Sequence, residues 1–296
     1  MRNSENVLNS LAGHSQDPNY KFERLYRLMY NENLYALAYQ NIAPNTGNCT
    51  KGADGQSIDG MSVKRIYSLI DRLKDESYRP YPAKRVYIPK KNGKKRPIGI
   101  PAFDDKLVQE VIKMVLEAIY EGHFEKCSHG FRPRRSCHTA LASISEGFDG
   151  TRWFIEGDIK GFFDNIDHEV MIRILGERIK DERFLRLIRK FLKAGYLEQW
   201  QFHETYCGTP QGGVLSPILA NIYLDKLDKY MVEYISSFNI GKARKRNPEY
   251  KRIGNRKDKR VKKLKNERDR QKIAALRMEI KKLHREMQQH PATLDM

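Results

Sequence analysis

The chain has 296 residues, of which 40% are hydrophobic and 31% are charged, and its formal net charge is +18. A chain of this length and apolar content can bury one or more compact cores. No apolar run approaches the roughly 18 residues that a membrane-spanning helix needs. Residues 1–19 also lack the pattern of a secretion signal, so we expect a cytoplasmic protein that does not enter a membrane.

Positive charge is concentrated near the C-terminus. Residues 241–290 carry 20 Lys/Arg and 6 Asp/Glu, a net charge of +14, whereas residues 1–240 carry 35 and 30. A segment this basic is expected to bind nucleic acid, because each phosphate contact releases condensed counterions. A solvated helix surface is the alternative interpretation of the same residues.

The four cysteines are scattered, and none forms a C-x-x-C pair. Cys127, His129, Cys137 and His138 are the one cluster of metal-ligating residue types, and their spacing matches no common zinc module. The sequence therefore favours ordinary thiols and loop histidines over a zinc site.

Two amphipathic helices are expected near the N-terminus. Between residues 20 and 41, apolar residues recur at helical spacing, and Lys21, Arg24 and Arg27 alternate with tyrosines. Aromatics among basic side chains suit RNA contact, and packing in a core is the alternative. The second helix should begin after Ser62, a favoured N-cap residue.

The clearest local motif is a β-hairpin. Segments 85–90 and 96–101 flank Asn92-Gly93, a dipeptide that favours a tight turn between strands. The loop and its flanks hold cations and no acid: Arg85, Lys90, Lys91, Lys94, Lys95 and Arg96. Such a hairpin can close over phosphate, and a lysine-protected edge strand is the alternative.

Helical periodicity continues in three further segments, 104–122, 138–147 and 170–194, the last divided near residue 180. A turn-rich loop at 206–217 then leads into another helix. Two adjacent glycines in that loop, Gly212 and Gly213, permit close approach of the backbone to a ligand.

The strongest candidate for chemistry is the segment 152–168, R-W-F-I-E-G-D-I-K-G-F-F-D-N-I-D-H. The apolar run at 153–155 predicts a strand that ends at Asp158, where an acid can hold a metal ion outside a sheet. Asp164 and Asp167 are expected to form a turn and to cap the next helix. Taken alone, these residues also fit a purely structural, Asp-rich turn.

The basic C-terminal segment should divide near Gly254. Beyond it, apolar residues repeat at alternating spacings of three and four at Ile273, Leu276, Ile280, Leu283 and Met287. This seam is two heptads long, which predicts helix pairing or docking on a partner more than a long coiled coil.

Four stretches, in this order, resemble the reverse transcriptases encoded by bacterial group II introns, also called intron maturases. They are a fingers hairpin at 85–101, S-H-G-F-R-P-R-R-S-C-H-T-A at 128–140, motif A at 152–168 and G-T-P-Q-G-G-V-L-S-P-I-L-A-N-I-Y-L at 208–224. The resemblance covers roughly residues 20–235. It implies an α+β fold, the right-hand fingers and palm of a polymerase, with helices packed on an antiparallel sheet. The implied activities are RNA-directed DNA synthesis and RNA splicing.

The resemblance also implies a domain order and a set of site residues. The expected parts are an N-terminal helical extension (1–50), fingers (51–150), palm (151–240) and a basic helical insertion (241–296). Asp158 and the Ile159 carbonyl match the positions that hold catalytic Mg²⁺. Nucleotide contacts are implied for Arg85, Lys90, Arg96, Phe163, Gln211 and Gly212. We expect RNA contacts at Lys21, Arg24, Arg27, Arg132, Arg134, Lys242, Arg244, Lys245, Arg246, Lys251, Arg252, Arg256 and Lys257.

The family's later motif, an aromatic residue followed by Ala-Asp-Asp, has no counterpart after Asp158. Phe103-Asp104-Asp105 precedes motif A and opens a helix. We therefore expect a fragment of a polymerase that binds Mg²⁺ weakly or not at all and does not extend a primer. Its expected partners are group II intron RNA, an RNA template with a DNA primer, and dNTP. A homodimer, a non-catalytic splicing cofactor and a retron-type enzyme remain alternatives.

Overall fold

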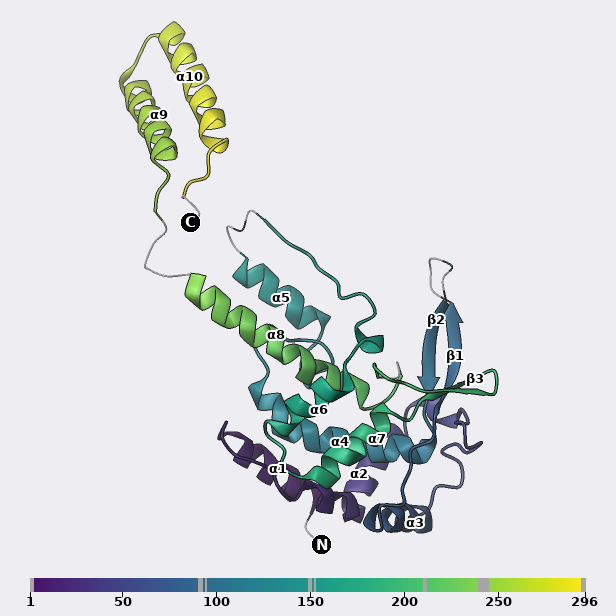
Figure 1. The fold of residues 1–296 in the computed structure, drawn as a ribbon. Helices are drawn as coiled ribbons and strands as arrows, with labels where there is room; N and C mark the ends of the chain where they lie inside the picture. Colours follow the sequence, from purple (N-terminus) through teal and green to yellow (C-terminus); the bar gives the residue numbers. More distant parts are fainter. Residues whose placement is uncertain are drawn as a thin grey trace. The chain divides into compact units, whose positions relative to one another are not determined.

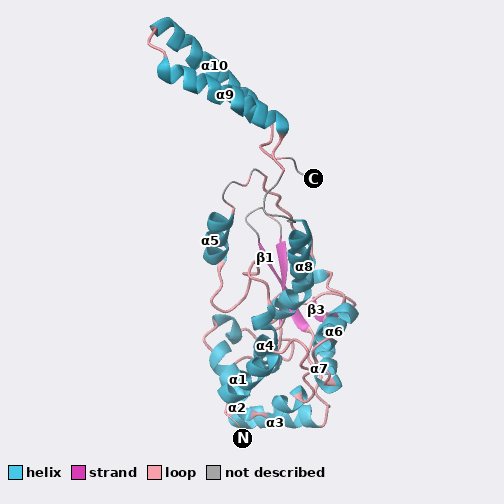
Figure 2. Ribbon diagram, turned by 90° about the vertical axis from the view of Figure 1, so that its left-hand side faces the viewer, coloured by secondary structure: helices cyan, strands magenta, loops and turns pink. Residues whose placement is uncertain are grey.

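The computed structural model describes residues 3–89, 93, 95–148, 151, 153–209, 212–238 and 245–293. These residues belong to two compact units, Met1–Met231 and Val232–Met296. The secondary structure is mixed, as the α+β prediction requires (Figures 1 and 2). Domain boundaries at residues 50, 150 and 240 remain predictions. None of the helices in the described ranges has the length and apolar content to span a membrane.

The first unit holds the strands and most of the helices of the described chain. Its α-helices are α1 (Ser4–Ser15), α2 (Glu32–Ile42), α3 (Val63–Lys74), α4 (Phe103–Tyr120), α5 (Cys137–Gly147), α6 (His168–Gly176), α7 (Glu182–Leu192) and α8 (Ser216–Phe238), which runs into the second unit. Its strands are β1 (Ala83–Pro89), β2 (Lys95–Ile100), β3 (Tyr196–Glu198) and β4 (Gln201–His203). Short 3₁₀ helices are η1 (Leu25–Tyr30), η2 (Thr46–Cys49), η3 (Glu121–His123) and η4 (Phe162–Asp164).

Helix α4 is the centre of the core. Apolar residues on several of its sides, including Leu107, Val111 and Leu116, are completely buried. Such all-round burial is typical of a helix surrounded by others, and α1, α2 and η1 pack against it. The helix expected at 104–122 is thereby confirmed.

The single helix expected at 20–41 is wrong, because Asn31 divides it. The backbone of Asn31 is extended, and its side chain accepts a hydrogen bond from the Asn33 amide, which caps α2. Asparagine favours such local bonds over a helix interior. Tyr26 and Tyr35 are buried, so these two tyrosines pack in the core and are not available to RNA.

Several predicted helix boundaries are confirmed by their caps. Ser62 accepts from the Arg65 amide at the start of α3. Asp167 accepts from Val170 in the first turn of α6. Asp181, at the predicted division of 170–194, accepts from the first turn of α7. In each case the side chain satisfies an amide that has no partner within the helix.

The sheet has the strand order β2-β1-β3-β4. The predicted hairpin is confirmed, with β1 and β2 antiparallel and Arg85 opposite Gly99. The expectation of an antiparallel sheet holds for two of the three strand pairs, because β1 and β3 run parallel. The sheet therefore joins the hairpin to a second hairpin, β3–β4, more than 100 residues later in the chain.

The strand expected before Asp158 is wrong. Residues 153–159 have irregular backbone, and Trp153 and Ile155 are 86% and 93% exposed. A strand is stabilised by a neighbour that satisfies its backbone groups. No strand within the described ranges lies beside this segment. Local apolar character alone is therefore insufficient to make the strand.

The second unit is a helical hairpin of α9 (Pro248–Asn266) and α10 (Arg270–Gln288). The division expected at Gly254 is wrong, since α9 continues through it and the turn falls at 267–269. A Cβ added at Gly254 would lie 3.8 Å from the Met287 sulfur, which reflects close packing of the two helices. The predicted helix pairing is confirmed, with Ile253 and Leu283 buried between them.

The fold buries one carboxyl group in an unusual state. Asp105, in the first turn of α4, is 1% exposed and accepts hydrogen bonds from the Tyr78 hydroxyl and the Tyr81 amide. Burial raises the pKa of Asp105 to about 7, because the ionised form loses its hydration. The two hydrogen bonds act in the opposite direction and only partly offset this.

This carboxyl should make stability depend on pH. Between about pH 4 and pH 7 the unfolded chain ionises Asp105 while the folded chain keeps its proton, so its contribution falls by about 1.4 kcal/mol per pH unit. Asp105→Asn keeps an acceptor for Tyr81 and a polar group for Tyr78, and it does not titrate. Urea unfolding at pH 5, 6 and 7 should show a smaller loss of stability in the variant than in the wild type. Parallel losses in the two proteins would contradict the raised pKa.

Candidate functional site

Two distant segments of the first unit are joined by backbone hydrogen bonds. The turn at 161–166 follows the candidate acid Asp158, and the loop at 207–209 begins the glycine-rich stretch. The Gly208 amide donates to the Ile166 carbonyl, and the Thr209 amide donates to the Phe163 carbonyl, both at 2.7 Å. We call this contact between 163–168 and 207–209 the clasp. It gives two irregular segments a fixed relative position.

Two side chains strengthen the clasp. His168 is buried, and its Nε2 donates to the Gly208 carbonyl at 2.7 Å. The Cys207 thiol donates to the Asp164 carbonyl at 3.2 Å. The Asp167–Cys207 bridge continues the contact along the backbone. The predicted turn and cap roles of Asp164 and Asp167 agree with these positions.

Glycine is required at two positions of the loop. Gly208 has φ +87°, and a Cβ there would lie 2.8 Å from the carbonyl oxygens of Phe163 and Asp164. Gly212 has φ +103°, and a Cβ there would lie 2.7 Å from the Gly99 oxygen of β2. A side chain is excluded at both by backbone conformation and by contact. The loop thus packs against the turn with one glycine and against the hairpin with another.

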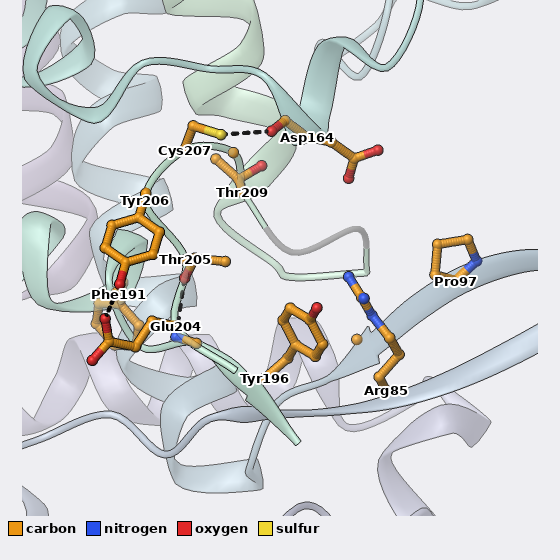
Figure 3. A pocket seen from close by; sticks show the side chains of 13 residues that line it. Arg85, Pro97, Asp164, Phe191, Tyr196, Glu204, Thr205, Tyr206, Cys207 and Thr209 are labelled. Carbon is orange, nitrogen blue, oxygen red and sulfur yellow. Dashed lines mark hydrogen bonds between the residues drawn. The ribbon is translucent and has the colours of Figure 1, made fainter. Parts of the chain in front are cut away.

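A cavity of about 310 Å³ lies where the turn, the loop and the hairpins meet (Figure 3). Its lining includes Arg85 and Pro97 from the β1–β2 hairpin, Asp164 from the turn and residues 204–209 from the loop. Figure 3 shows Asp164 and Thr209 on one side of it and Arg85 with Tyr196 on another. Residues predicted from separate motifs therefore line one space.

Arg85 is held in a stack of side chains in this cavity. Its guanidinium lies 3.5 Å from the centre of the Tyr196 ring, and the Tyr196 ring stacks on His203 with centroids 4.9 Å apart. Arg85 also pairs with Glu198 at 3.7 Å. Stacking and pairing fix the planar cation and neutralise part of its charge. The predicted contact of Arg85 with a triphosphate remains a prediction.

Tyr196, Glu198 and His203 were missed by the sequence reasoning. They lie on the short hairpin β3–β4, whose turn residues Gln199 and Trp200 have φ of 50° and 66°. Tight hairpin turns with positive φ usually contain Gly, Asn or Asp. Polar and apolar residues alternate over 199–203, which is a signal for a strand, and the absence of a turn dipeptide conceals the hairpin.

The other predicted nucleotide and metal residues are placed as follows. Phe163 is half-buried in the clasp with its ring against Phe162, and Arg96 is exposed on β2. Asp158 and Ile159 lie on the exposed, irregular segment before the turn and do not line the cavity. Lys90 and Gln211 fall outside the described residues.

The described residues provide only part of a magnesium site. Mg²⁺ requires near-octahedral oxygen coordination, usually from one or two carboxylates, water and substrate phosphates. Asp158 supplies one exposed carboxylate, and Ile159 a neighbouring carbonyl. No group of three or more His, Cys, Asp or Glu side chains that could hold a metal occurs in the described ranges. The ligand set is therefore incomplete in these residues.

Arg132, one of the predicted RNA contacts, has a structural role instead. It is 9% exposed, pairs with Glu121 at 3.0 Å and donates to the carbonyls of Glu125 and Ser128. Its guanidinium also lies 5.1 Å from the Phe124 ring centre. These partners occupy its donors, which leaves none for a phosphate. Arg134, two residues on, is exposed with φ 58°.

The remaining predicted RNA contacts lie on two surfaces. In the first unit, Lys21, Arg24 and Arg27 are exposed. In the second unit, the predicted contacts that are exposed or half-buried are Lys245, Arg246, Lys251, Arg252, Arg256 and Lys257. Arg252 pairs with Glu249 at 3.2 Å and Arg256 with Glu286 at 3.9 Å. Exposed pairs of this kind are weak and exchange readily for phosphate. Lys242 and Arg244 fall outside the described residues.

One cavity brings together a basic hairpin, an Asp-bearing turn and a glycine-rich loop. This arrangement is the one expected for the fingers and palm of a nucleic-acid polymerase. The profile of the family "Reverse transcriptase (RNA-dependent DNA polymerase)" matches residues 88–241, more than half of the chain. The chain belongs to this reverse transcriptase family.

Similar proteins define the branch of the family. Over 235 residues the chain is 54% identical to the "Group II intron-encoded protein LtrA" of Lactococcus lactis subsp. cremoris, a match covering 79% of this chain and 39% of that protein. It is 45% identical over 258 residues to the "Uncharacterized 91 kDa protein in cob intron" of Schizosaccharomyces pombe, covering 84% and 32%. It is 30% identical over 192 residues to "Nuclear intron maturase 1, mitochondrial" of Arabidopsis thaliana, covering 46% and 27%. The chain thus spans about two fifths of the length of the bacterial relative. The predicted resemblance to intron-encoded reverse transcriptases is confirmed.

The clasp should be sensitive to a single methyl group. Gly208→Ala places a Cβ against two carbonyl oxygens in a left-handed conformation, and we expect a loss of about 2 kcal/mol or more in the free energy of unfolding. Gly176→Ala is the matched control, since nothing lies within 4 Å of a Cβ at that helical position. Urea unfolding followed by circular dichroism measures both. Equal stabilities for the two variants would show that the clasp does not hold the loop.

Proposed function

We propose that the chain forms the fingers and part of the palm of a group II intron reverse transcriptase, an RNA-directed DNA polymerase. The observation that carries the proposal is the cavity beside the clasp, where the basic hairpin, the Asp164 turn and the glycine-rich loop meet. Family membership and 54% identity to an intron-encoded protein support it. Because the chain covers 39% of that relative, DNA synthesis by the whole protein is itself part of the proposal.

The predicted residues have distinct roles in this function. Phe163 would lie beneath the sugar of the incoming nucleotide, where an aromatic ring discriminates against a 2′-hydroxyl. Arg96, Lys90 and Arg85 would contact the triphosphate, and Gln211 with Gly212 the nucleotide and template. Asp158 and the Ile159 carbonyl would contribute to Mg²⁺ binding. The chemistry that bound Mg²⁺ would supply here is activation of the primer hydroxyl and stabilisation of the leaving pyrophosphate.

The second part of the proposal is binding of intron RNA, the maturase function. It rests on the cations of α9, most of which face solvent, and on the exposed Lys21, Arg24 and Arg27. A cytoplasmic location and a homodimer remain predictions. A retron-type enzyme would copy RNA without helping an intron to splice, so an intron splicing assay with the chain added separates the two.

RNA affinity should depend on salt through α9. The logarithm of the RNA association constant falls as the logarithm of the salt concentration rises. Replacing Lys251, Arg252 and Arg256 with Gln should make this slope shallower by about 2, since each phosphate contact contributes roughly 0.7–0.9. Filter binding of a structured intron RNA between 50 and 200 mM salt, about the range in which this term dominates, measures the slope. A matched triple variant on α10, Lys272, Arg277 and Lys281 to Gln, should change it less. These residues are exposed as well. The same slope in both triple variants would refute the assignment to α9.

The 296-residue chain should bind a DNA primer on an RNA template without extending it. The physical reason is that one exposed carboxylate, Asp158, cannot position two Mg²⁺ ions. Gel analysis of the primer after incubation with dNTP and Mg²⁺ measures extension, with a full-length relative as the positive control. Primer lengthening above the background of an Asp158→Asn variant would contradict this prediction.

A further inference from the structure

A second cavity lies in the first unit and shares no lining residue with the one beside the clasp. It has a volume of about 230 Å³, and its lining residues come from the segment after α1, from α4 and the turn that follows it, from the end of α6 and from α8. Its ionisable lining consists chiefly of Lys21, Glu177, Arg178, Asp225, Lys226 and Lys229. The family motifs described above include none of these residues.

Helical geometry gathers these groups. On α8, Asp225, Lys226 and Lys229 follow Ile222 by three, four and seven residues, and this spacing places all four on one face of the helix. Glu177 directly follows α6, and its carboxylate pairs with Lys226 at 2.5 Å. The Glu177 carbonyl accepts from the Lys21 ammonium at 2.6 Å.

The cavity favours an anion. Four cations and two carboxylates border it, so its formal charge is positive. Lys21 uses one of its three donors on Glu177, and Lys226 and Lys229 are each 46% exposed. These ammonium groups retain donors that can bind phosphate oxygens.

Two buried polar atoms of the lining residues have no hydrogen-bond partner among the described residues. Asp225 is 6% exposed, and its Oδ2 accepts from Lys229 at 2.5 Å, whereas its Oδ1 is unpartnered. The Nε of Arg178 is also buried and unpartnered. One is an acceptor and the other a donor, and leaving either unpaired is unfavourable. A sugar hydroxyl can donate to the first, and a phosphate or sugar oxygen can accept from the second.

We propose that this cavity binds one ribose–phosphate unit of an RNA strand, with the phosphate held by Lys21, Lys226 and Lys229 and the 2′-hydroxyl donating to Asp225 Oδ1. The inference rests on the proposed function in one respect, that the chain binds RNA. A volume below the 300–1,000 Å³ usual for larger ligands suits a backbone unit. Both unpartnered atoms belong to residues that line the cavity, and the exposed side chains of Lys226 and Lys229 border the same space.

This assignment makes the cavity a sensor of the sugar. The 2′-hydroxyl is the group by which a protein distinguishes RNA from DNA at a given contact. Lys226 and Lys229 would bind the phosphate of either RNA or DNA, whereas Asp225 would form its hydrogen bond only with the 2′-hydroxyl of ribose. Affinity and discrimination therefore depend on different residues of one helix face.

The test compares the affinities of a short single-stranded RNA and the DNA of the same sequence. The affinity for RNA divided by the affinity for DNA should be about tenfold lower in Asp225→Leu than in the wild type. This is the effect expected from the loss of one hydrogen bond to a charged group. Asp228→Leu, on the same helix and outside the cavity lining, is the matched control and should leave the ratio unchanged. Lys226→Gln should lower the affinities for RNA and for DNA equally, and so leave their ratio unchanged. Thermal unfolding confirms that each variant is folded.

The outcomes separate this proposal from the proposed function. A wild-type ratio near one, or a ratio that Asp225→Leu does not alter, overturns the ribose site while RNA binding itself stands. No binding of either strand refutes the proposed RNA-binding function as well. Adenosine 5′-monophosphate distinguishes a strand from a free nucleotide, because displacement of the RNA by about 1 mM of it, a concentration at which weak sites fill, would overturn the assignment to a strand.

Discussion

The clasp between 163–168 and 207–209 is the contact on which the candidate site depends. Apart from the short η4 turn and His168, the first residue of α6, neither segment has regular structure of its own, and each would otherwise have unsatisfied amides. Two backbone hydrogen bonds and the buried His168 side chain join them at 2.7 Å each. The cavity of about 310 Å³ exists because this contact holds Asp164 and Thr209 opposite the hairpins.

The same constraint explains why glycine stands in the loop without reference to any ligand. At Gly208 a side chain would collide with the turn, and at Gly212 with β2. Packing is thus a sufficient reason for both glycines. Packing against β2 already explains the conformation of Gly212, so that conformation is not evidence for a nucleotide contact. The proposed contact is supported instead by the neighbouring cavity and by family membership. A glycine-rich motif can serve both close packing and ligand binding, and only the surrounding contacts distinguish the two roles.

Sequence predicted those features whose causes are local. Ser62, Asp167 and Asp181 cap helices because a short polar side chain and the amides it satisfies lie within three residues of each other. The Asn92-Gly93 hairpin signal is equally local. Features with distant causes were not predictable. The run at 153–155 has strand composition and no strand partner, and Arg132 has the charge of an RNA contact but uses its donors on Glu121 and nearby carbonyls. The candidate cavity itself combines residues more than 100 positions apart, so its motifs could be named from sequence but not assembled.

Net charge reveals only one of the two proposed RNA-binding surfaces. The cations of α9 belong to the +14 segment and are visible in any composition count, whereas Lys21, Arg178, Lys226 and Lys229 come from a part of the chain whose charges nearly balance. Counterion release depends on how many phosphates are neutralised, so the α9 surface should set the affinity and its dependence on salt. Discrimination between sugars depends instead on a buried acceptor that only a hydroxyl satisfies, which solvated lysines cannot provide. Strong but unselective attraction and weak but selective recognition are therefore assigned to separate residues, and a change in one need not alter the other.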